Sequence, residues 1–221
     1  MARKTGQKRE LTRQKVIDAA LEVLKETPTG TLTMRQVADR CGVTAMAIYH
    51  HVEDKELLKK LAVDQIFLDV AGEMTTADKP WREAIIDMWI TIRTKLLETP
   101  GAGMIFVSQA IVGPGTARTT EEMFRLLHNA GLRGDAVAEA ADSMTILSIG
   151  SIANELTRPA RVRDGLGRQI DTAEMPYMGK YLTHYSHRNA AQRYERALNW
   201  LLDGIFHKHG LSPGTEGGPA P

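Results

Sequence analysis

Apolar side chains recur at helical spacing through most of the chain. In the first such segment, from Leu11 to Lys25, the apolar residues share one helical face, and Pro28 and Gly30 then end the pattern. No segment alternates between apolar and polar residues over the length of a strand. We therefore predict an all-α protein. The predicted helices cover residues 11–25, 33–41, 44–51, 54–72, 80–98, 104–112, 119–129, 135–156, 176–184 and 189–208.

The second and third of these helices carry the signals of a helix-turn-helix. Thr33 and Gln36 fit a capping box at the start of the second helix. Gly42 supplies the left-handed residue of a tight turn, and Ala38 is the small residue where the two helices approach. Thr44 is expected to cap the third helix. Such a unit can place its third helix in the major groove of DNA.

These patterns divide the chain into four regions. We predict a disordered basic arm at residues 1–10, a helix-turn-helix domain at residues 11–53, a larger helical domain at residues 54–210 and a disordered tail at residues 211–221. The second region is called the reading head below and the third the larger domain. Within the larger domain, the charged, Gly-containing stretch at residues 159–173 is predicted to be a mobile loop.

Charge is distributed unevenly between these regions. The chain carries 28 Lys and Arg against 27 Asp and Glu, but residues 1–60 hold twelve basic and eight acidic side chains. The other 161 residues hold sixteen basic and nineteen acidic side chains. A basic N-terminal region favours contact with a polyanion, although the arm taken alone is more typical of a solubilising tail.

Several classes of protein do not fit the sequence. A single cysteine, Cys41, excludes an internal disulfide framework, and no run of 18 apolar residues predicts a transmembrane helix. The basic N-terminus has no apolar run behind it, so we expect no secretory signal and a cytoplasmic protein. Three Gly-x-Gly segments lack the third glycine and the preceding strand of a dinucleotide site. We predict no enzyme, no cofactor, no metal site and no membrane partner.

The run LTMRQVADRCGVTAMAIYHHVEDKELL, residues 32–58, resembles the DNA-binding domain of TetR-family transcriptional repressors. The resemblance continues upstream through VIDAALEVL and covers about 60 N-terminal residues. It implies a sequence-specific regulator, in most cases a repressor, that binds a palindromic operator as a homodimer and is released by a small molecule. By position, it implies phosphate contacts for Thr33, Tyr49 and Lys55, and base contacts for Arg35, Ala45, Met46, Ala47 and His50.

The predicted recognition helix offers little polar chemistry. Residues 44–47 are Thr, Ala, Met and Ala, and none of them has an amide or guanidinium group that could make a bidentate contact with a base. Thr44 is also expected to face the DNA. We hypothesise that the apolar side chains at 45–47 meet thymine methyl groups and that Arg35 reads a guanine. His50 is placed towards the DNA, and His51 in the core of the reading head.

Two helices of the larger domain are candidates for a dimer interface. The segment from Asp135 to Leu156 is apolar almost all round, and the segment from Asn189 to Lys208 carries a broad apolar stripe. We predict that both pair with their symmetry mates in an isologous four-helix bundle. An intramolecular core without a dimer is the alternative.

The resemblance also implies a small-molecule effector site in the larger domain, which we expect to be largely apolar. The candidate lining residues are Phe67, Trp89, Ile92, Arg93, Phe106, Gln109, Met123, Phe124, Leu127, Met144, Leu147 and Asn154. An ordinary core produces the same pattern more often than a pocket does. Tetracycline-binding members of the family hold their drug through a metal bound partly by histidine, whereas His128 is the only histidine between residues 52 and 183. The effector is therefore left open.

The rival interpretation is a helical adaptor that binds protein instead of DNA. The salt dependence of DNA binding separates the two. A dimer that neutralises ~6–10 phosphates loses on the order of 10³–10⁵ in affinity between 50 and 200 mM salt, whereas an adaptor shows no such binding.

Overall fold

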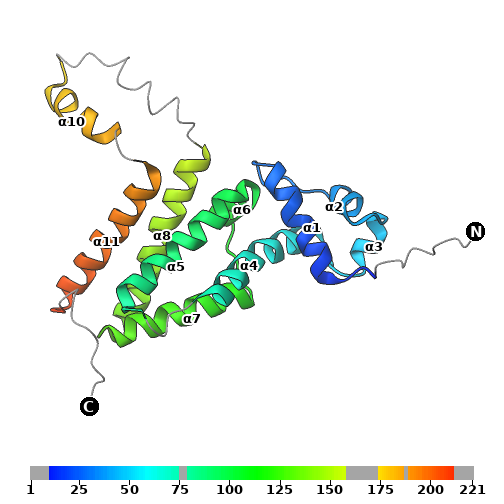
Figure 1. Ribbon diagram of the computed structural model, residues 1–221, viewed down its shortest axis with the longest axis horizontal. Coiled ribbons are helices and arrows are strands. Elements are labelled where there is room, and N and C mark those ends of the chain that lie inside the picture. The colour runs from blue at the N-terminus through cyan, green and yellow to red at the C-terminus, as the bar shows by residue number, and fades with distance from the viewer. Residues whose placement is uncertain (1–9, 75–78, 158–173, 187–188, 212–221) are drawn as a thin grey trace, which may run out of the picture.

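The computed structural model describes residues 10–74, 79–157, 174–186 and 189–211 of the 221-residue chain. Within them every regular element is a helix, which confirms the predicted all-α class. The body is elongated, with the N-terminal helices at one end and α8, α10 and α11 towards the other (Figure 1). The helices are α1 (Arg13–Glu26), α2 (Met34–Cys41), α3 (Ala45–Tyr49), α4 (Lys55–Glu73), α5 (Trp81–Glu98), α6 (Pro100–Ser108), α7 (Pro114–Asn129), α8 (Asp135–Thr157), α10 (Pro176–Ser186) and α11 (Ala190–Lys208).

Two of the predicted helix starts were wrong, for the same reason. The sequence pattern placed them near residues 104 and 119, whereas α6 begins at Pro100 and α7 begins at Pro114. In the sequence, each proline fits the end of a preceding element, which predicts a later start for the next helix. Proline also suits the first turn of a helix, because the amide that it lacks has no intrahelical partner there. The predicted end of α6 at residue 112 was also late, because Gln109 already has extended backbone.

Helix α4 connects the two ends of the molecule (Figure 1). It packs against α1 of the reading head and against α5, α6 and α7 of the larger domain. The Asp64 carboxylate is buried where α4 meets α7, and it accepts hydrogen bonds from the backbone amides of Gly115 (2.9 Å) and Thr116 (2.8 Å). A carboxylate at a helix N-terminus satisfies unpaired amides and complements the helix dipole. This contact fixes α7 to the middle of α4.

A second contact joins the reading head directly to the larger domain. Near its start, α6 lies so close to the end of α1 that an ideal Cβ on Gly101 would be 2.5 Å from the carbonyl oxygen of Thr27 and 2.6 Å from that of Leu24. On the facing side Gly30 has a positive φ of 72°, which favours glycine. Only glycine at position 101 allows the two backbones to approach this closely.

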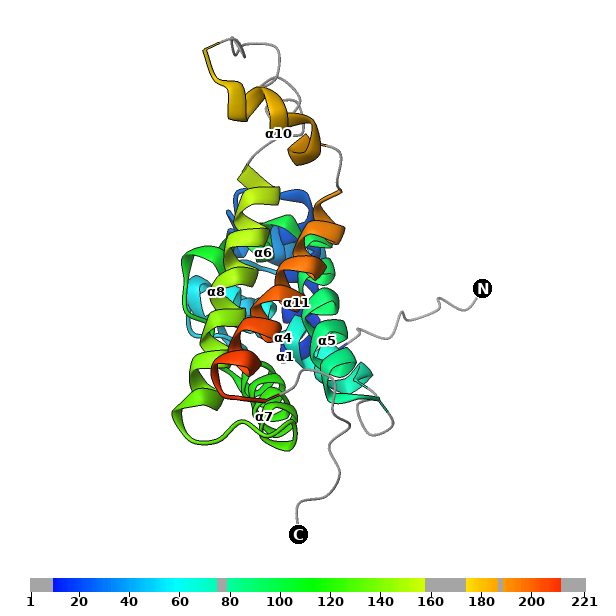
Figure 2. The same cartoon turned by 90° about the vertical axis from the view of Figure 1, so that its left-hand side faces the viewer.

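Helices α8 and α11 lie side by side in both views (Figures 1 and 2) and pack against α5. In the single chain α8 buries one stripe, made of Ala136, Ala140, Ala141, Met144, Ser148 and Ile152. Its remaining surface is half-buried or exposed, and Ile146 is 62% exposed. By length and composition alone α8 could cross a membrane, and it is the one helix among the described residues that could. Its buried stripe is typical of a core helix in a globular protein.

Several predicted segments lie outside the described residues. They are residues 1–9 of the basic arm, the loop at residues 159–173, and the tail from residue 212. Leu211, predicted to begin the tail, is half-buried, packs on Gly131 and donates its amide to the carbonyl of Phe206 (2.9 Å).

Candidate functional site

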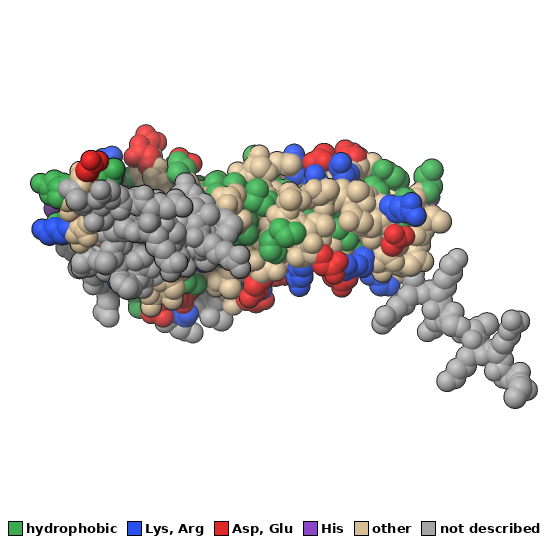
Figure 3. Space-filling model, turned by 90° about the horizontal axis from the view of Figure 1, so that it is seen from above, with side chains coloured by type: hydrophobic (Ala, Val, Ile, Leu, Met, Phe, Trp, Pro, Cys, Tyr) green, Lys and Arg blue, Asp and Glu red, His purple; other side chains and the backbone are tan. Residues whose placement is uncertain are grey.

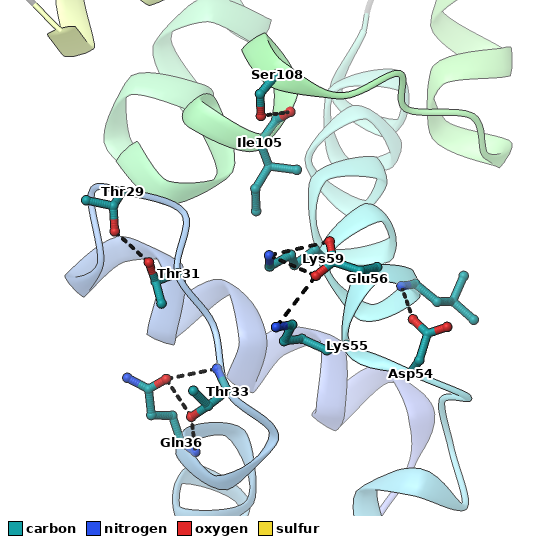
Figure 4. A network of polar contacts seen from close by, with 11 residues as sticks. Thr29, Thr31, Thr33, Gln36, Asp54, Lys55, Glu56, Lys59, Ile105 and Ser108 are labelled. Atoms are coloured by element: carbon teal, nitrogen blue, oxygen red, sulfur yellow. Dashed lines mark hydrogen bonds and ion pairs between the residues drawn. The ribbon is translucent and has the colours of Figure 1, made fainter.

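The helix-turn-helix is built from short-range interactions. At the start of α2 the Thr33 amide donates to Gln36 Oε1 (2.9 Å) and the Gln36 amide donates to Thr33 Oγ1 (3.2 Å), which completes the capping box (Figure 4). At the end of α2, Gly42 is left-handed, with φ 67°. The amide of Val43 then donates to the carbonyl of Ala38 (3.0 Å). This turn sets the direction of α3.

The orientation of α3 follows from its one fully buried side chain. Ile48 is 0% exposed and packs in the core that also contains Val37 and Ala38 of α2. The opposite face is open to solvent, where Met46 is 70% exposed and Tyr49 is 48% exposed. Because α3 lies at the outer end of the elongated body (Figure 1), this face can approach a long, flat or grooved partner without obstruction from the larger domain.

The other predicted residues of the recognition helix have intermediate or open positions. Ala45 and Ala47 are half-buried, and Thr44 and His50 are exposed. Thr44 stands at the N-cap position, but its side chain makes no capping hydrogen bond, so the predicted capping interaction was wrong. Helix α3 also ends at Tyr49 instead of residue 51. His51, expected in the core, is half-buried.

Basic side chains near α3 differ in how they are held. Arg40 donates to Glu22 (3.2 Å) and also pairs with Glu26, so it fixes α2 to α1, and the hydrogen bond to Glu22 raises the pKa of Arg40. Arg35 is exposed, and no ion pair within the described part of the chain holds it. Arg35 is therefore the basic side chain of α2 that can turn towards a partner.

The start of α4 presents a mixed cluster of charges (Figure 4). The Asp54 carboxylate caps the helix by accepting from the Leu57 amide (2.7 Å). Glu56 pairs with Lys59 (3.1 Å) and Lys55 (3.7 Å), and the hydrogen bond from Lys59 lowers the pKa of Glu56. Basic and acidic side chains are interspersed on the face shown in Figure 3 as well. Charge alone therefore does not mark a binding face there.

Most of the predicted effector-site residues lie in one continuous core. Those that are buried are Phe67, Trp89, Ile92, Arg93, Phe106, Met123, Leu127 and Met144. Gln109 and Leu147 are half-buried, whereas Phe124 is 37% exposed and Asn154 is exposed. Trp89 Nε1 is the buried side-chain polar atom that lacks a hydrogen-bond partner among the described residues. Buried polar atoms are usually paired, so this N–H is available to donate a hydrogen bond to a bound ligand.

Arg93 is already engaged inside this core. It donates to Ser151 Oγ (3.0 Å) and pairs with Glu155 (3.2 Å), and its guanidinium lies 5.3 Å from the ring centroid of Tyr194. Burial lowers the pKa of Arg93. The Tyr194 hydroxyl lies 2.6 Å from Ser148 Oγ. These contacts join α5, α8 and α11, which is a structural role beside the predicted ligand contact.

Grooves open on the described part of the larger domain, and two of them lie beside α5 and α7. A groove of about 260 Å³ lies between α4 and α5. None of its lining residues is among the predicted effector-site residues. They are Val70, Glu73, Met74, Lys79, Ala84, Asp87, Met88, Ile90 and Thr91. A groove of about 310 Å³ lies along the start of α7 and is lined by Ile111, Val112, Gly113, Thr116, Ala117, Thr120, Glu121 and Phe124. Of the predicted effector residues, Phe124 lines one of these two grooves. Side chains around a groove come from separate helices, so no sequence spacing indicated it.

An N-terminal and a C-terminal segment of the chain each match a known family model. Residues 16–59 match the model for bacterial regulatory proteins of the tetR family, and residues 75–208 match the tetracyclin repressor-like C-terminal domain. The chain belongs to the TetR family. It is a helix-turn-helix, DNA-binding transcriptional regulator with an N-terminal reading head and a larger helical domain.

Individual relatives of this TetR-family regulator cover most of its length. An HTH-type transcriptional regulator of Saccharopolyspora erythraea is 29% identical over 171 residues, which are 76% of this chain and 72% of that protein. The tetracycline repressor protein class A from transposon 1721 of Escherichia coli is 24% identical over 205 residues, 91% of this chain and 94% of that protein. The Streptomyces coelicolor TetR family protein ActR, in complex with (S)-DNPA, shares the fold with a TM-score of 0.74 and 20% identity over 90% of this chain and 98% of that chain.

Proposed function

We propose that this TetR-family regulator is a cytoplasmic, homodimeric repressor that binds a palindromic operator and is released by a small, largely apolar effector. The observation that carries the proposal is the outward face of α3 at the far end of the molecule, fixed from behind by buried Ile48. One reading head contacts few base pairs, so specific binding requires two heads on the two half-sites of an operator.

The DNA contacts are assigned by side-chain chemistry and exposure. Thr33, Tyr49 and Lys55 hold phosphates, with the Thr33 hydroxyl exchanging its hydrogen bond to Gln36 for one to a phosphate oxygen. The outward residues of the turn and of α3 face base edges together with Arg35 of α2, which reads a guanine. The base-facing set is Arg35, Thr44, Ala45, Met46, Ala47 and His50.

The dimer forms through α8 and α11. Each of these adjacent helices exposes a large apolar side chain in the single chain, Ile146 at 62% and Trp200 at 66%. A two-fold arrangement would bury both and would turn the half-buried surface of α8 into an interface core.

Effector release acts through α4. An effector that binds more tightly to one orientation of the reading heads can shift the population only by that difference in affinity. Asp64 holds α4 to α7, so a displacement of α7 by an effector reaches the reading head directly. Tetracycline repressors act on a metal-chelated drug, whereas His128, an exposed residue of α7, is the one histidine here between residues 52 and 183. We therefore infer an effector of another chemistry.

Selection of DNA from a random library with the purified protein tests the function. We expect enrichment of a palindrome whose half-sites are centred about 34–36 Å apart or a multiple of that distance. We also expect affinity to fall on the order of 10³–10⁵-fold between 50 and 200 mM salt. Binding without an enriched palindrome, or no DNA binding at all, would contradict the proposal.

The same binding measurements distinguish a base contact of Arg35 from a phosphate contact. Arg35→Ala should lower affinity for the selected operator about 10- to 100-fold and leave affinity for random DNA nearly unchanged. Arg118→Ala, which removes another exposed arginine, from α7, is the matched control and should change neither affinity. An equal loss on operator and random DNA from Arg35→Ala would make Arg35 a phosphate contact only.

A further inference from the structure

The segment that faces the bases contains no side chain able to form paired hydrogen bonds with one base. From Val43 to Val52 there is no Arg, Lys, Asn, Gln, Asp or Glu. These are the residues that discriminate guanine, adenine and cytosine by bidentate or charged contacts in the major groove. Specificity from this segment must therefore come largely from apolar contacts.

Met46 is far more exposed than the alanines on either side of it. Met46 is 70% exposed, whereas its neighbours Ala45 and Ala47 are half-buried and have one side-chain carbon each. Buried Ile48 fixes the helix from behind and leaves Met46 on the outward face. The long, unbranched thioether is thus the most exposed apolar side chain of α3.

The apolar group that a base pair presents in the major groove is the C5 methyl of thymine. We propose that Met46 contacts a thymine methyl group in each half-site, so that this protein selects thymine at that position of its operator. The proposal rests on the proposed function and assigns the base class that its recognition helix selects. Ala45 and Ala47 set the close approach of α3, and Tyr49 and His50 contribute single hydrogen bonds at its end.

Replacing thymine by deoxyuridine in the selected operator tests this directly, because only the methyl group is removed. We would substitute each thymine first in one half-site and then in both half-sites, and measure binding by fluorescence anisotropy. At one position, the substitution should lower binding affinity about 4-fold in a single half-site and about 15-fold in both. These losses correspond to about 0.8 kcal/mol for each methyl group removed from contact.

Three variants identify the side chain responsible. Met46→Ala should bind the thymine operator more weakly and become insensitive to deoxyuridine at that one position, which a double-mutant cycle reports as coupling. Met46→Leu keeps an apolar chain and should retain the sensitivity. Met178→Ala, on α10 and 38% exposed, is the control for loss of an exposed methionine and should behave as the wild type. Circular dichroism verifies that each variant is folded.

The outcomes separate this inference from the function beneath it. A protein that selects a palindrome but tolerates deoxyuridine at every half-site position overturns the role of Met46 and leaves the regulator intact. Sensitivity that persists unchanged in Met46→Ala assigns the methyl contact to another residue and also overturns the inference. Failure to select any sequence overturns the proposed function and the inference together.

Discussion

The start of α2 in the reading head is closed by residues close in sequence, whereas the start of α7 in the larger domain depends on a distant partner. Thr33 and Gln36, which start α2, are three residues apart. Asp64, which caps α7, lies 51 residues from Gly115. Local caps form as soon as the helix does, but a distant cap forms only after the chain has brought two helices together.

The same contrast applies to two ion pairs. Arg40 and Glu22, in the head, are 18 residues apart, whereas Arg93 and Glu155 are separated by 62 residues. The reading head is thus a small unit with an exposed working face. The larger domain is a packed core whose polar groups depend on the mutual position of α5, α8 and α11. Substitutions should therefore be costly in the larger domain and at its junction with the head, and modest at the local caps.

The largest effect is expected where the two regions meet. In Gly101→Ala the added methyl group would lie 2.5–2.6 Å from two α1 carbonyl oxygens, so α1 and α6 must separate. We expect a loss of about 3 kcal/mol in the free energy of unfolding, measured with urea, and weaker operator binding because the head is displaced. Gly72→Ala, on α4 with no atom within 4 Å of the added carbon, is the control and should stabilise by up to about 1 kcal/mol. Equal effects of both substitutions would exclude the close junction.

An intermediate effect is expected at high pH. Burial raises the pKa of Tyr194 to about 12 from its usual 10, so the folded protein keeps this proton at a pH where the unfolded chain releases it. The stabilisation is complete below pH 10 and is lost as the pH rises towards 12. At pH 11 the loss relative to pH 8 is about 1.4 kcal/mol.

Tyr194→Phe isolates this contribution. The variant lacks the titrating hydroxyl and its contact with Ser148, so it should be less stable than the wild type at pH 8. Its unfolding free energy, measured by urea titration at several pH values, should nevertheless fall less steeply above pH 10. Parallel curves for the two proteins would show that Tyr194 does not carry the dependence.

The smallest effect is expected at the local cap of α2. Thr33→Ala removes the acceptor of the Gln36 amide and should cost about 1 kcal/mol of stability. Thr44→Ala is a matched control, because Thr44 occupies the N-cap position of α3 without a capping hydrogen bond. Thermal unfolding should therefore separate the two variants. A Thr44 variant destabilised as much as the Thr33 variant would argue against this assignment of the caps.

The sequence predicted the reading head in more detail than the larger domain. The capping box at Thr33 and the left-handed Gly42 both follow from residue type and spacing over a few positions. The starts of α6 and α7 were mistaken because proline both ends and begins helices, and only the packing of Gly101 and Asp64 decides between them. The grooves beside α5 and α7 had no local signal at all.

The sequence by itself determined that the chain is helical, that residues 33–49 form a helix-turn-helix and that α3 lacks bidentate hydrogen-bonding side chains. Those properties depend on backbone preferences and side-chain chemistry, which act over one or two helical turns. Only the tertiary structure decided that Met46 protrudes while its neighbours recede, that Asp64 fixes α7 to α4 and that Gly101 joins α6 to α1. Exposure and close contact are set by segments distant in sequence, and their mutual positions follow from the packing of the whole core.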